Sequence, residues 1–301
     1  MTEQLNKCSD TELQYRENFK RDYKFSCPVL DDTDIFKKSL TIAGLKQEWD
    51  DYYNMCQTIP KFDDYRREMR NTIIQSLTSV KGYSELNISN IESSDKYKGP
   101  KSYLRDDLID KWLVSVDLVK GNYQAMKSLN PAFVENTNTY EELIGKYTKH
   151  EPIIRSKFFR QMIFGQLNPQ VQALVQQKMI QHIIDEIYKQ HKFEICFLSN
   201  DEVIFVINSE DDKTVIEKVS KNMPYQIHVT EFSIVKIPNS YNEPWYVKQY
   251  IGSFKFRIMG VHTRYLMQVY NYHWGFINEP KDFMWRECGR LCMILEPEKF
   301  E

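Results

Sequence analysis

Two short apolar segments joined by an acidic turn constrain the fold of this 301-residue chain more than any other feature. Residues 193–198 are apolar except for Glu194, residues 203–207 are apolar throughout, and the four residues Ser-Asn-Asp-Glu at 199–202 separate them. Apolar segments of this length on either side of a turn are typical of a β-hairpin. The hairpin would place two carboxylates, Asp201 and Glu202, at one end of a sheet.

The elements expected around this hairpin define a sheet topology. They are a strand over 111–118, helices over 122–129, 139–147 and 153–190, the hairpin, a helix over 213–223 and an extended segment over 225–237. The long helical stretch is expected to be interrupted between Gly165 and Pro169. The order β-α-β-β-α-β predicts an α+β fold, with an antiparallel sheet and helices on one face.

Three regions are expected along the chain. Residues 1–110 are polar, with apolar residues at helical spacing, and predict a helical N-terminal region that ends in a loop or linker at 87–102. Residues 111–240 would hold the sheet, and residues 241–301 would form a small C-terminal segment. No internal repeat or low-complexity tract is found.

Composition excludes several classes of protein. Hydrophobic residues at 42% and charged residues at 27% indicate a folded chain, and no apolar run is long enough to span a membrane. A net charge of −2 excludes a wholly basic nucleic-acid binder but allows a local basic groove. The six cysteines predict free thiols in a reducing cytosol, and a zinc site at Cys288 and Cys292 would lack a second ligand pair. We therefore expect a cytoplasmic protein with no membrane partner.

Asp117, Asp201 and Glu202 are the candidate catalytic and metal-binding residues. In a βαββαβ sheet the first and third strands are neighbours, so Asp117 at the end of the first would approach the acids of the hairpin turn. Converging carboxylates repel one another unless a cation lies between them, and two-metal phosphoryl transfer uses such an arrangement. The sequence thus predicts Mg²⁺ or Mn²⁺ here, and a separation well above ~10 Å would exclude it. The alternative is that these acids only keep a strand end and a turn soluble.

A basic and aromatic segment, residues 248–274, predicts contact with nucleic acid. It holds four Lys or Arg residues and no Asp or Glu. The four are Lys248, Lys255, Arg257 and Arg264. Cations interleaved with aromatic rings are typical of surfaces that bind a nucleic-acid backbone, although an ordinary protein surface would also explain them.

Three segments resemble the palm motifs A, B and C of family B DNA polymerases. Residues 115–124, Ser-Val-Asp-Leu-Val-Lys-Gly-Asn-Tyr-Gln, resemble the first motif, in which a strand ends in a metal-binding Asp. Residues 157–165, Lys-Phe-Phe-Arg-Gln-Met-Ile-Phe-Gly, resemble the helical motif, with Lys, the aromatic ring and Gly at matching offsets. Residues 198–206 resemble the Tyr-Gly-Asp-Thr-Asp-Ser motif. The resemblance covers residues 112–222, or 112–265 with a Lys-containing, Gly-ended segment after the palm.

The resemblance implies a role for each matching residue. Asp117, Asp201 and Glu202 would bind the metal. The nucleotide-binding residues would be Lys157, with Arg155 and Arg160, at the triphosphate, Phe164 and Gly165 beside the nascent base pair, and Asn122 or Tyr123 at the sugar. A solvated helix face would equally explain the three cations, and burial in the core would explain the aromatic ring.

The function implied is that of a minimal palm-type nucleotidyltransferase. It would act on a primer-template or a single strand with a nucleoside triphosphate, with fingers reduced to a stub at 125–156 and a thumb-like segment at 241–301. Residues 1–110 would be free for a protein partner. So stripped a palm is typical of a virus or phage product.

Departures from the motifs keep other hypotheses open. Asn200-Asp201-Glu202 replaces Asp-Thr-Asp, so a degenerate palm that binds nucleic acid or serves as a structural subunit is the alternative. The acidic hairpin is also similar, more loosely, to the palms of nucleotide cyclases and reverse-direction tRNA nucleotidyltransferases. An unrelated α+β protein is the third hypothesis.

Overall fold

The computed structural model describes most of the chain. The described residues are 8–23, 25, 27, 29–59, 61–91, 96–239, 244–252, 256–262, 265 and 269, with only the backbone of 42, 90, 284–287 and 290–293.

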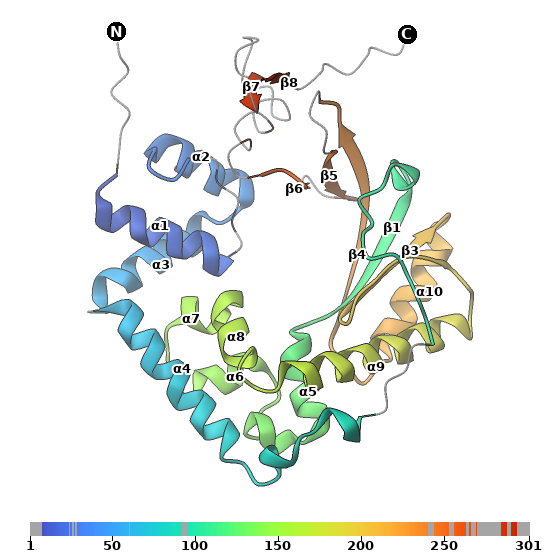
Figure 1. Cartoon of the computed structure of the whole chain (residues 1–301), viewed down its shortest axis with the longest axis horizontal. Coiled ribbons are helices and arrows are strands. Elements are labelled where there is room, and N and C mark those ends of the chain that lie inside the picture. The colour runs from blue at the N-terminus through green and yellow to red at the C-terminus, as the bar shows by residue number, and fades with distance from the viewer. Residues whose placement is uncertain are drawn as a thin grey trace.

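A helical lobe and a sheet form the two sides of the molecule, and α5 and α9 join them (Figure 1). The helices are α1 (Asp10–Tyr23), α2 (Thr33–Ala43), α3 (Lys46–Thr58), α4 (Phe62–Thr78), α5 (Gly121–Leu129), α6 (Tyr140–Gly145), α7 (Glu151–Arg155), α8 (Lys157–Phe164), α9 (Pro169–Tyr188) and α10 (Glu210–Lys221). The strands are β1 (Trp112–Leu118), β2 (Glu194–Leu198), β3 (Glu202–Ile207), β4 (Ile227–Ile237), β5 (Trp245–Tyr250), β6 (Phe256–Met259), β7 (Met284–Glu287) and β8 (Arg290–Met293).

The main sheet has six antiparallel strands in the order β2-β3-β1-β4-β5-β6, and β7 pairs with β8 separately. The predicted α+β class, the hairpin and the pairing of the first and third strands are therefore confirmed. The order of the first four strands, with α5–α9 between β1 and β2 and α10 between β3 and β4, follows the predicted β-α-β-β-α-β succession.

The alternation of side chains along β1 gives the sheet two different faces. Val114, Val116 and Leu118 pack with apolar residues of α9 and α10 in one core cluster. The intervening positions, Leu113, Ser115 and Asp117, must point to the opposite face because successive strand residues alternate. The second face carries a smaller apolar cluster. We call this second face, on which Asp117 lies, the open face.

The predicted interruption between α8 and α9 is confirmed and has a local cause. Asn168 adopts a positive φ of 51°, and Pro169 takes the first position of α9, where its missing N–H costs nothing. Gly165 ends α8, and a Cβ atom there would lie 2.7 Å from the carbonyl oxygen of Gln161. Glycine at 165 is thus explained by close approach of the backbone.

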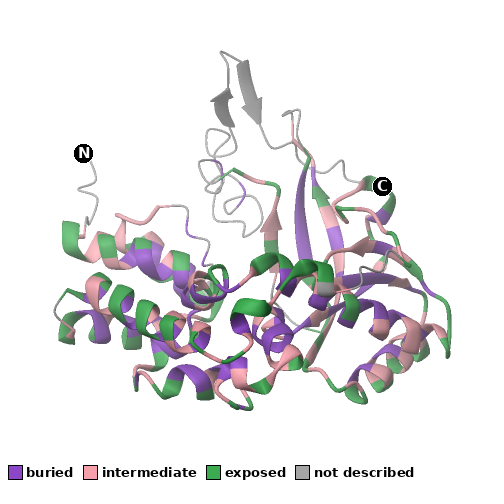
Figure 2. Cartoon of the chain, turned by 60° about the horizontal axis from the view of Figure 1, so that its bottom comes forward, coloured by how far each residue is buried: buried purple, intermediate pink, exposed green. Residues whose placement is uncertain are grey.

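The N-terminal helices share one core with the segment between β1 and α9. Phe19, Tyr52, Ile73, Phe159 and Phe164 belong to the same buried cluster. Figure 2 shows buried residues along the inner sides of these helices as well as on the strands. The helical N-terminal region is confirmed, but its core does not end at the predicted boundary after residue 110.

A buried ion pair ties α1 to α4 inside this core. Asp22 accepts hydrogen bonds from both terminal nitrogens of Arg66, at 2.8 and 3.0 Å, and from the Tyr52 hydroxyl at 3.1 Å. The two charged side chains are 1% and 4% exposed. The carboxylate is therefore fully compensated, which a buried charge requires.

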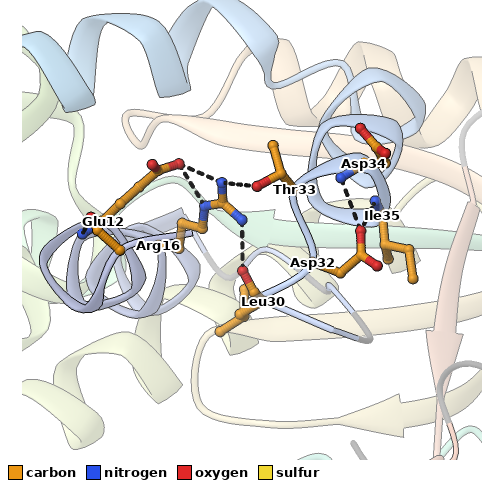
Figure 3. Close-up of polar contacts among 8 residues, drawn as sticks. Glu12, Arg16, Leu30, Asp32, Thr33, Asp34 and Ile35 are labelled. Atoms are coloured by element: carbon orange, nitrogen blue, oxygen red, sulfur yellow. Dashed lines mark hydrogen bonds and ion pairs between the residues drawn. The ribbon is translucent and has the colours of Figure 1, made fainter. Parts of the chain in front are cut away.

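A second buried arginine fixes the start of α2 (Figure 3). Arg16 donates to the Leu30 carbonyl at 2.8 Å and to the Thr33 hydroxyl at 3.1 Å, and it pairs with Glu12 one turn away. Asp32 caps α2 by accepting the N–H groups of residues 34 and 35. These contacts hold the chain between α1 and α2 against both helices.

Two expectations about segment boundaries differ from the structure. The boundary expected after residue 240 falls between β4 and β5, which pair along six residues, so the C-terminal segment begins inside the sheet. The linker expected at 87–102 is not a free tether either, because the Pro100 carbonyl accepts the Leu198 N–H at 3.2 Å and Tyr97 packs against the core cluster of β1 and α9. The consecutive apolar residues Trp245, Tyr246 and Val247 of β5, all buried, explain the first difference, and the packing of Tyr97 explains the second.

Candidate functional site

The strand register brings Asp117 and Glu202 together. Asp117 in β1 lies directly opposite Glu202 in β3, and the Leu118 N–H donates to the Asp201 carbonyl at 2.9 Å. Residues directly opposite in antiparallel strands have Cα atoms about 4.5–5.5 Å apart and side chains on the same face. The predicted convergence of the acids is therefore confirmed for this pair, which lies on the open face.

Asp117 is held in an environment that opposes its charge. Burial, together with the negative charges of Glu202 and Asp201, raises the pKa of Asp117 from 3.8 to about 7. The positive charges of Lys157 and Lys248 act in the opposite direction. Among the described residues, no hydrogen bond or ion pair is made by the Asp117 carboxylate. Asp117 is therefore a half-buried acid whose charge is opposed by burial and by its acidic neighbours and only partly offset by Lys157 and Lys248.

The two acids of the hairpin are held differently. Glu202 accepts a hydrogen bond from the Ser115 hydroxyl at 2.5 Å, from the same face of β1. Asp201 is exposed in the turn and accepts from the Ser199 hydroxyl at 3.0 Å. A Cβ atom on Gly121 would lie 3.5 Å from the Cβ of Asp201, so the turn packs closely on the start of α5. Glu202 is thus oriented, whereas Asp201 faces solvent.

Lys248 lies beside the acids rather than on the outer surface. Its side chain is only 8% exposed, and its ammonium nitrogen lies 3.7 Å from the ring centroid of Phe232, 5.3 Å from that of Tyr250 and 5.5 Å from that of Tyr103. Burial lowers the pKa of Lys248, and the charges of Glu202 and Asp117 oppose that effect. We call these three rings the Lys248 cage.

Arg257 is the neighbour of Lys248 across the β5–β6 pair, so two of the four predicted nucleic-acid contacts lie in the same sheet as the acids. The other two, Lys255 and Arg264, lie outside the described residues. The same holds for most of 263–283.

The three cations expected at a triphosphate have different surroundings. Lys157 begins α8, is exposed and acts on the charge of Asp117. Arg160, one turn later, is partly buried, and its charge also interacts with Asp117. Arg155 instead pairs with Glu151 at 3.0 Å on the exposed side of α7. Lys157 and Arg160 are therefore electrostatically connected to the acids, and Arg155 is engaged elsewhere.

The residues expected at the base and the sugar are largely structural. Phe164 is 0% exposed and Tyr123 is 3% exposed, and their rings pack together with centroids 6.3 Å apart. The Tyr123 hydroxyl donates to the Thr137 carbonyl at 2.8 Å. Asn122 donates to Gln172 of α9 at 2.8 Å. The plainer explanation of the aromatic ring, burial in the core, fits Phe164.

Sequence reasoning missed several residues of the open face. His228 of β4 lies opposite Asp117, and its exposed ring is 3.1 Å from the Thr230 hydroxyl. Tyr103, which follows the expected linker, lies near the same site, because burial and the charge of Glu202 raise its pKa to about 12. Alternation along 225–237 and pairing with β1 would have placed His228. No comparable signal marks Tyr103.

Asp117 and Glu202 are suited to a divalent cation such as Mg²⁺, which retains several of its water ligands when bound. Mg²⁺ is usually bound by one or two carboxylates plus water and substrate phosphates. Asp117 and Glu202 supply two such carboxylates. Within the residues that the structure describes, no group of three or more His, Cys, Asp or Glu side chains is placed to hold a metal. Any ion here would therefore depend on oxygen atoms from a substrate or solvent.

Comparison with models of known protein families and with curated proteins gives no match to this chain. In the described part of the chain, no helix has both the length and the apolar character needed to cross a membrane.

Proposed function

We propose that this protein is a minimal palm-type nucleotidyltransferase that adds nucleotides to a nucleic acid. The observation that carries the proposal is the register of β1 and β3, which sets Asp117 beside Glu202 on the open face of a β2-β3-β1-β4 sheet. The unpaired, half-buried Asp117 and the surrounding cations support it.

Each side of the site has a part in this reaction. Asp117 and Glu202 would hold Mg²⁺ or Mn²⁺, with Ser115 keeping the Glu202 carboxylate in place. A bound divalent ion would stabilise charge on the phosphoryl group and on the attacking and leaving oxygens. Lys157 and Arg160 would attract the triphosphate from the α8 side. Phosphoryl transfer depends mainly on such positioning and charge stabilisation.

The transfer itself would follow the usual in-line course. The 3′-hydroxyl oxygen of the nucleic acid attacks the α-phosphorus of the nucleoside triphosphate, the bond to pyrophosphate breaks, and the hydroxyl proton passes to solvent. Arg257, the exposed neighbour of Lys248 on β6, lies in the same sheet as the acids, where it would attract the nucleic-acid backbone toward the reacting atoms. Residues 241–301 would then act as a rudimentary thumb.

The proposal is tested by nucleotide incorporation. Labelled nucleoside triphosphate with Mg²⁺ or Mn²⁺ is offered with a primer-template, with a single-stranded oligonucleotide and with tRNA. We expect incorporation on at least one of these by the wild type, and a loss of at least about 100-fold in Asp117→Ala and Glu202→Gln. Asp50→Ala is the matched control, because Asp50 is an exposed carboxylate of α3. No incorporation by the wild type, or equal rates in all four proteins, would contradict the proposal.

A specific observation favours a second function. Lys248 already places a caged positive charge beside both acids, so the pair has a resident counter-charge. This is compatible with a palm that binds nucleic acid without catalysing transfer.

Calorimetry with Mn²⁺ separates the two functions. The nucleotidyltransferase requires binding by the wild type that is lost in Asp117→Ala and kept in Asp50→Ala. If no protein binds Mn²⁺, or all three bind alike, the catalytic proposal is refuted. A shift of a labelled oligonucleotide that Arg257→Met weakens would then support the binding function, because Arg257 is the exposed cation beside Lys248.

A further inference from the structure

A second cluster of charges lies next to the acids, where the turn after β1 meets α6. Lys120 precedes α5 with a positive φ of 53°, a conformation uncommon for lysine. Its ammonium group forms an ion pair with the carboxylate of Glu141, the second residue of α6. The two side chains are 23% and 39% exposed, so solvent reaches the pair.

Arg160 interacts with the same carboxylate from α8. Burial lowers the pKa of Arg160, whereas the negative charges of Glu141 and Asp117 raise it. The Nε atom of Arg160 is buried and has no hydrogen-bond partner within the described residues. Arg160 therefore has an unused donor in a place where an anion is already present.

The ring of Tyr140 connects the two cations. Its centroid lies 5.9 Å from the Lys120 ammonium nitrogen and 5.7 Å from the central carbon of the Arg160 guanidinium. Tyr140 itself is 1% exposed and belongs to the buried core, so both cations contact a ring that is fixed by its packing. Two cations held around one rigid ring suit a ligand with several linked anionic groups better than a single carboxylate.

We propose that Glu141 is an internal competitor for polyphosphate: its carboxylate holds Lys120, on the same ring as Arg160, until a polyphosphate attracted by both cations displaces it. Arg offers phosphate several donors in a fixed fork, and a polyphosphate carries more charge than one carboxylate. A partly exposed ion pair is weak, so such a ligand can break it. The inference rests on the proposed function in one respect: polyphosphate is chosen as the ligand because the neighbouring acids are proposed to act on a nucleoside triphosphate. Glu141 would then regulate the binding of that triphosphate.

Direct binding of inorganic tripolyphosphate tests the proposal without nucleotide, nucleic acid or metal. Calorimetry at low ionic strength compares the wild type with Glu141→Gln, which keeps the shape of the side chain and removes its charge. We expect the variant to bind about threefold to tenfold more tightly. Glu151→Gln is the matched control, because Glu151 is an exposed helical glutamate whose partner is Arg155. We expect the control to bind like the wild type.

A double variant identifies the cation that is released. Adding Lys120→Met to Glu141→Gln is expected to abolish the gain in affinity. Glu141→Ser, which also removes the charge, is expected to behave like Glu141→Gln, so one poorly folded variant would not decide the result.

Three results would overturn the proposal: unchanged or weaker binding in both Glu141 variants, an equal gain in Glu151→Gln, or no binding by any protein. A wild type that fails to incorporate nucleotide while Glu141→Gln gains affinity would refute the proposed reaction and keep the competitor. If the wild type incorporates nucleotide but neither Glu141 variant gains affinity for tripolyphosphate, only the competitor role of Glu141 is refuted.

Discussion

Replacing Asp117 with asparagine is expected to stabilise the metal-free protein at alkaline pH. Burial and the charges of Glu202 and Asp201 raise the pKa of this carboxyl from 3.8 to about 7. A raised pKa in the folded state contributes stability that is complete below the ordinary pKa of the group and is lost as the pH rises to about 7. Above that pH the fold must hold an ionised carboxylate at an unfavourable position.

The size of the effect follows from the shift. A rise from 3.8 to about 7 corresponds to about 4 kcal/mol if the charge is wholly excluded from solvent. Asp117 is only half-buried, so solvent screening reduces the expected value to about 2 kcal/mol. Asparagine has the same shape without the charge, and Asp117→Asn should therefore gain about 2 kcal/mol above the raised pKa and less than about half of that near pH 5.

Urea unfolding with a chelator present, at about pH 5 and about pH 8.5, measures the difference. Asp50→Asn removes an exposed carboxylate and should stay within about 0.5 kcal/mol of the wild type at both values. Asp201→Asn should give a smaller gain than Asp117→Asn, because it removes only one of the repelling charges. Equal stability of Asp117→Asn and the wild type at alkaline pH would refute this account of the acid pair.

Two further predictions concern the scaffold. Asp22→Asn leaves Arg66 buried without its counter-charge and should lower the free energy of unfolding by about 3–5 kcal/mol. Urea unfolding measures the change, and an unchanged midpoint would show that the ion pair is not needed. Gln172 is fully buried and bonds Asn122 and two backbone carbonyls at the end of α8, so Gln172→Leu should cost about 2–4 kcal/mol. Gln170→Leu, exposed on the same helix, is the control, and an equal loss in both would contradict this role.

Local patterns were sufficient to predict the sheet. Short apolar runs and a turn predicted β1 and the β2–β3 hairpin, and alternation predicted β4, each to within a few residues; the topology then made Asp117 and Glu202 neighbours. That inference needed no long-range information, because antiparallel pairing of the first and third strands follows from the order of elements. The metal and the reaction stay predictions.

The surroundings of the acids depended on contacts that sequence patterns do not encode. Lys248 was expected to face a nucleic-acid backbone because it belongs to an acid-free segment, but β5 pairs with β4 and turns it toward the acids. Tyr103 directly follows the stretch at 87–102 that composition marked as a linker, and no sequence pattern connects it with the acids. Lys120 and Glu141 are 21 residues apart, and only the packing of α6 on the turn after β1 pairs them. Such long-range pairings come from tertiary packing.

The shared core of the N-terminal helices has a consequence for how the molecule opens. Because α1 and α4 pack on α8, the first eighty residues and α8 belong to one cooperative unit, whereas the acids belong to the sheet. Proteins open locally in such units with less free energy than global unfolding requires. Transient release of the helical unit would carry Lys157 and Arg160 away while leaving Asp117 and Glu202 paired. Hydrogen exchange should then show the two halves of the site exchanging at separate rates.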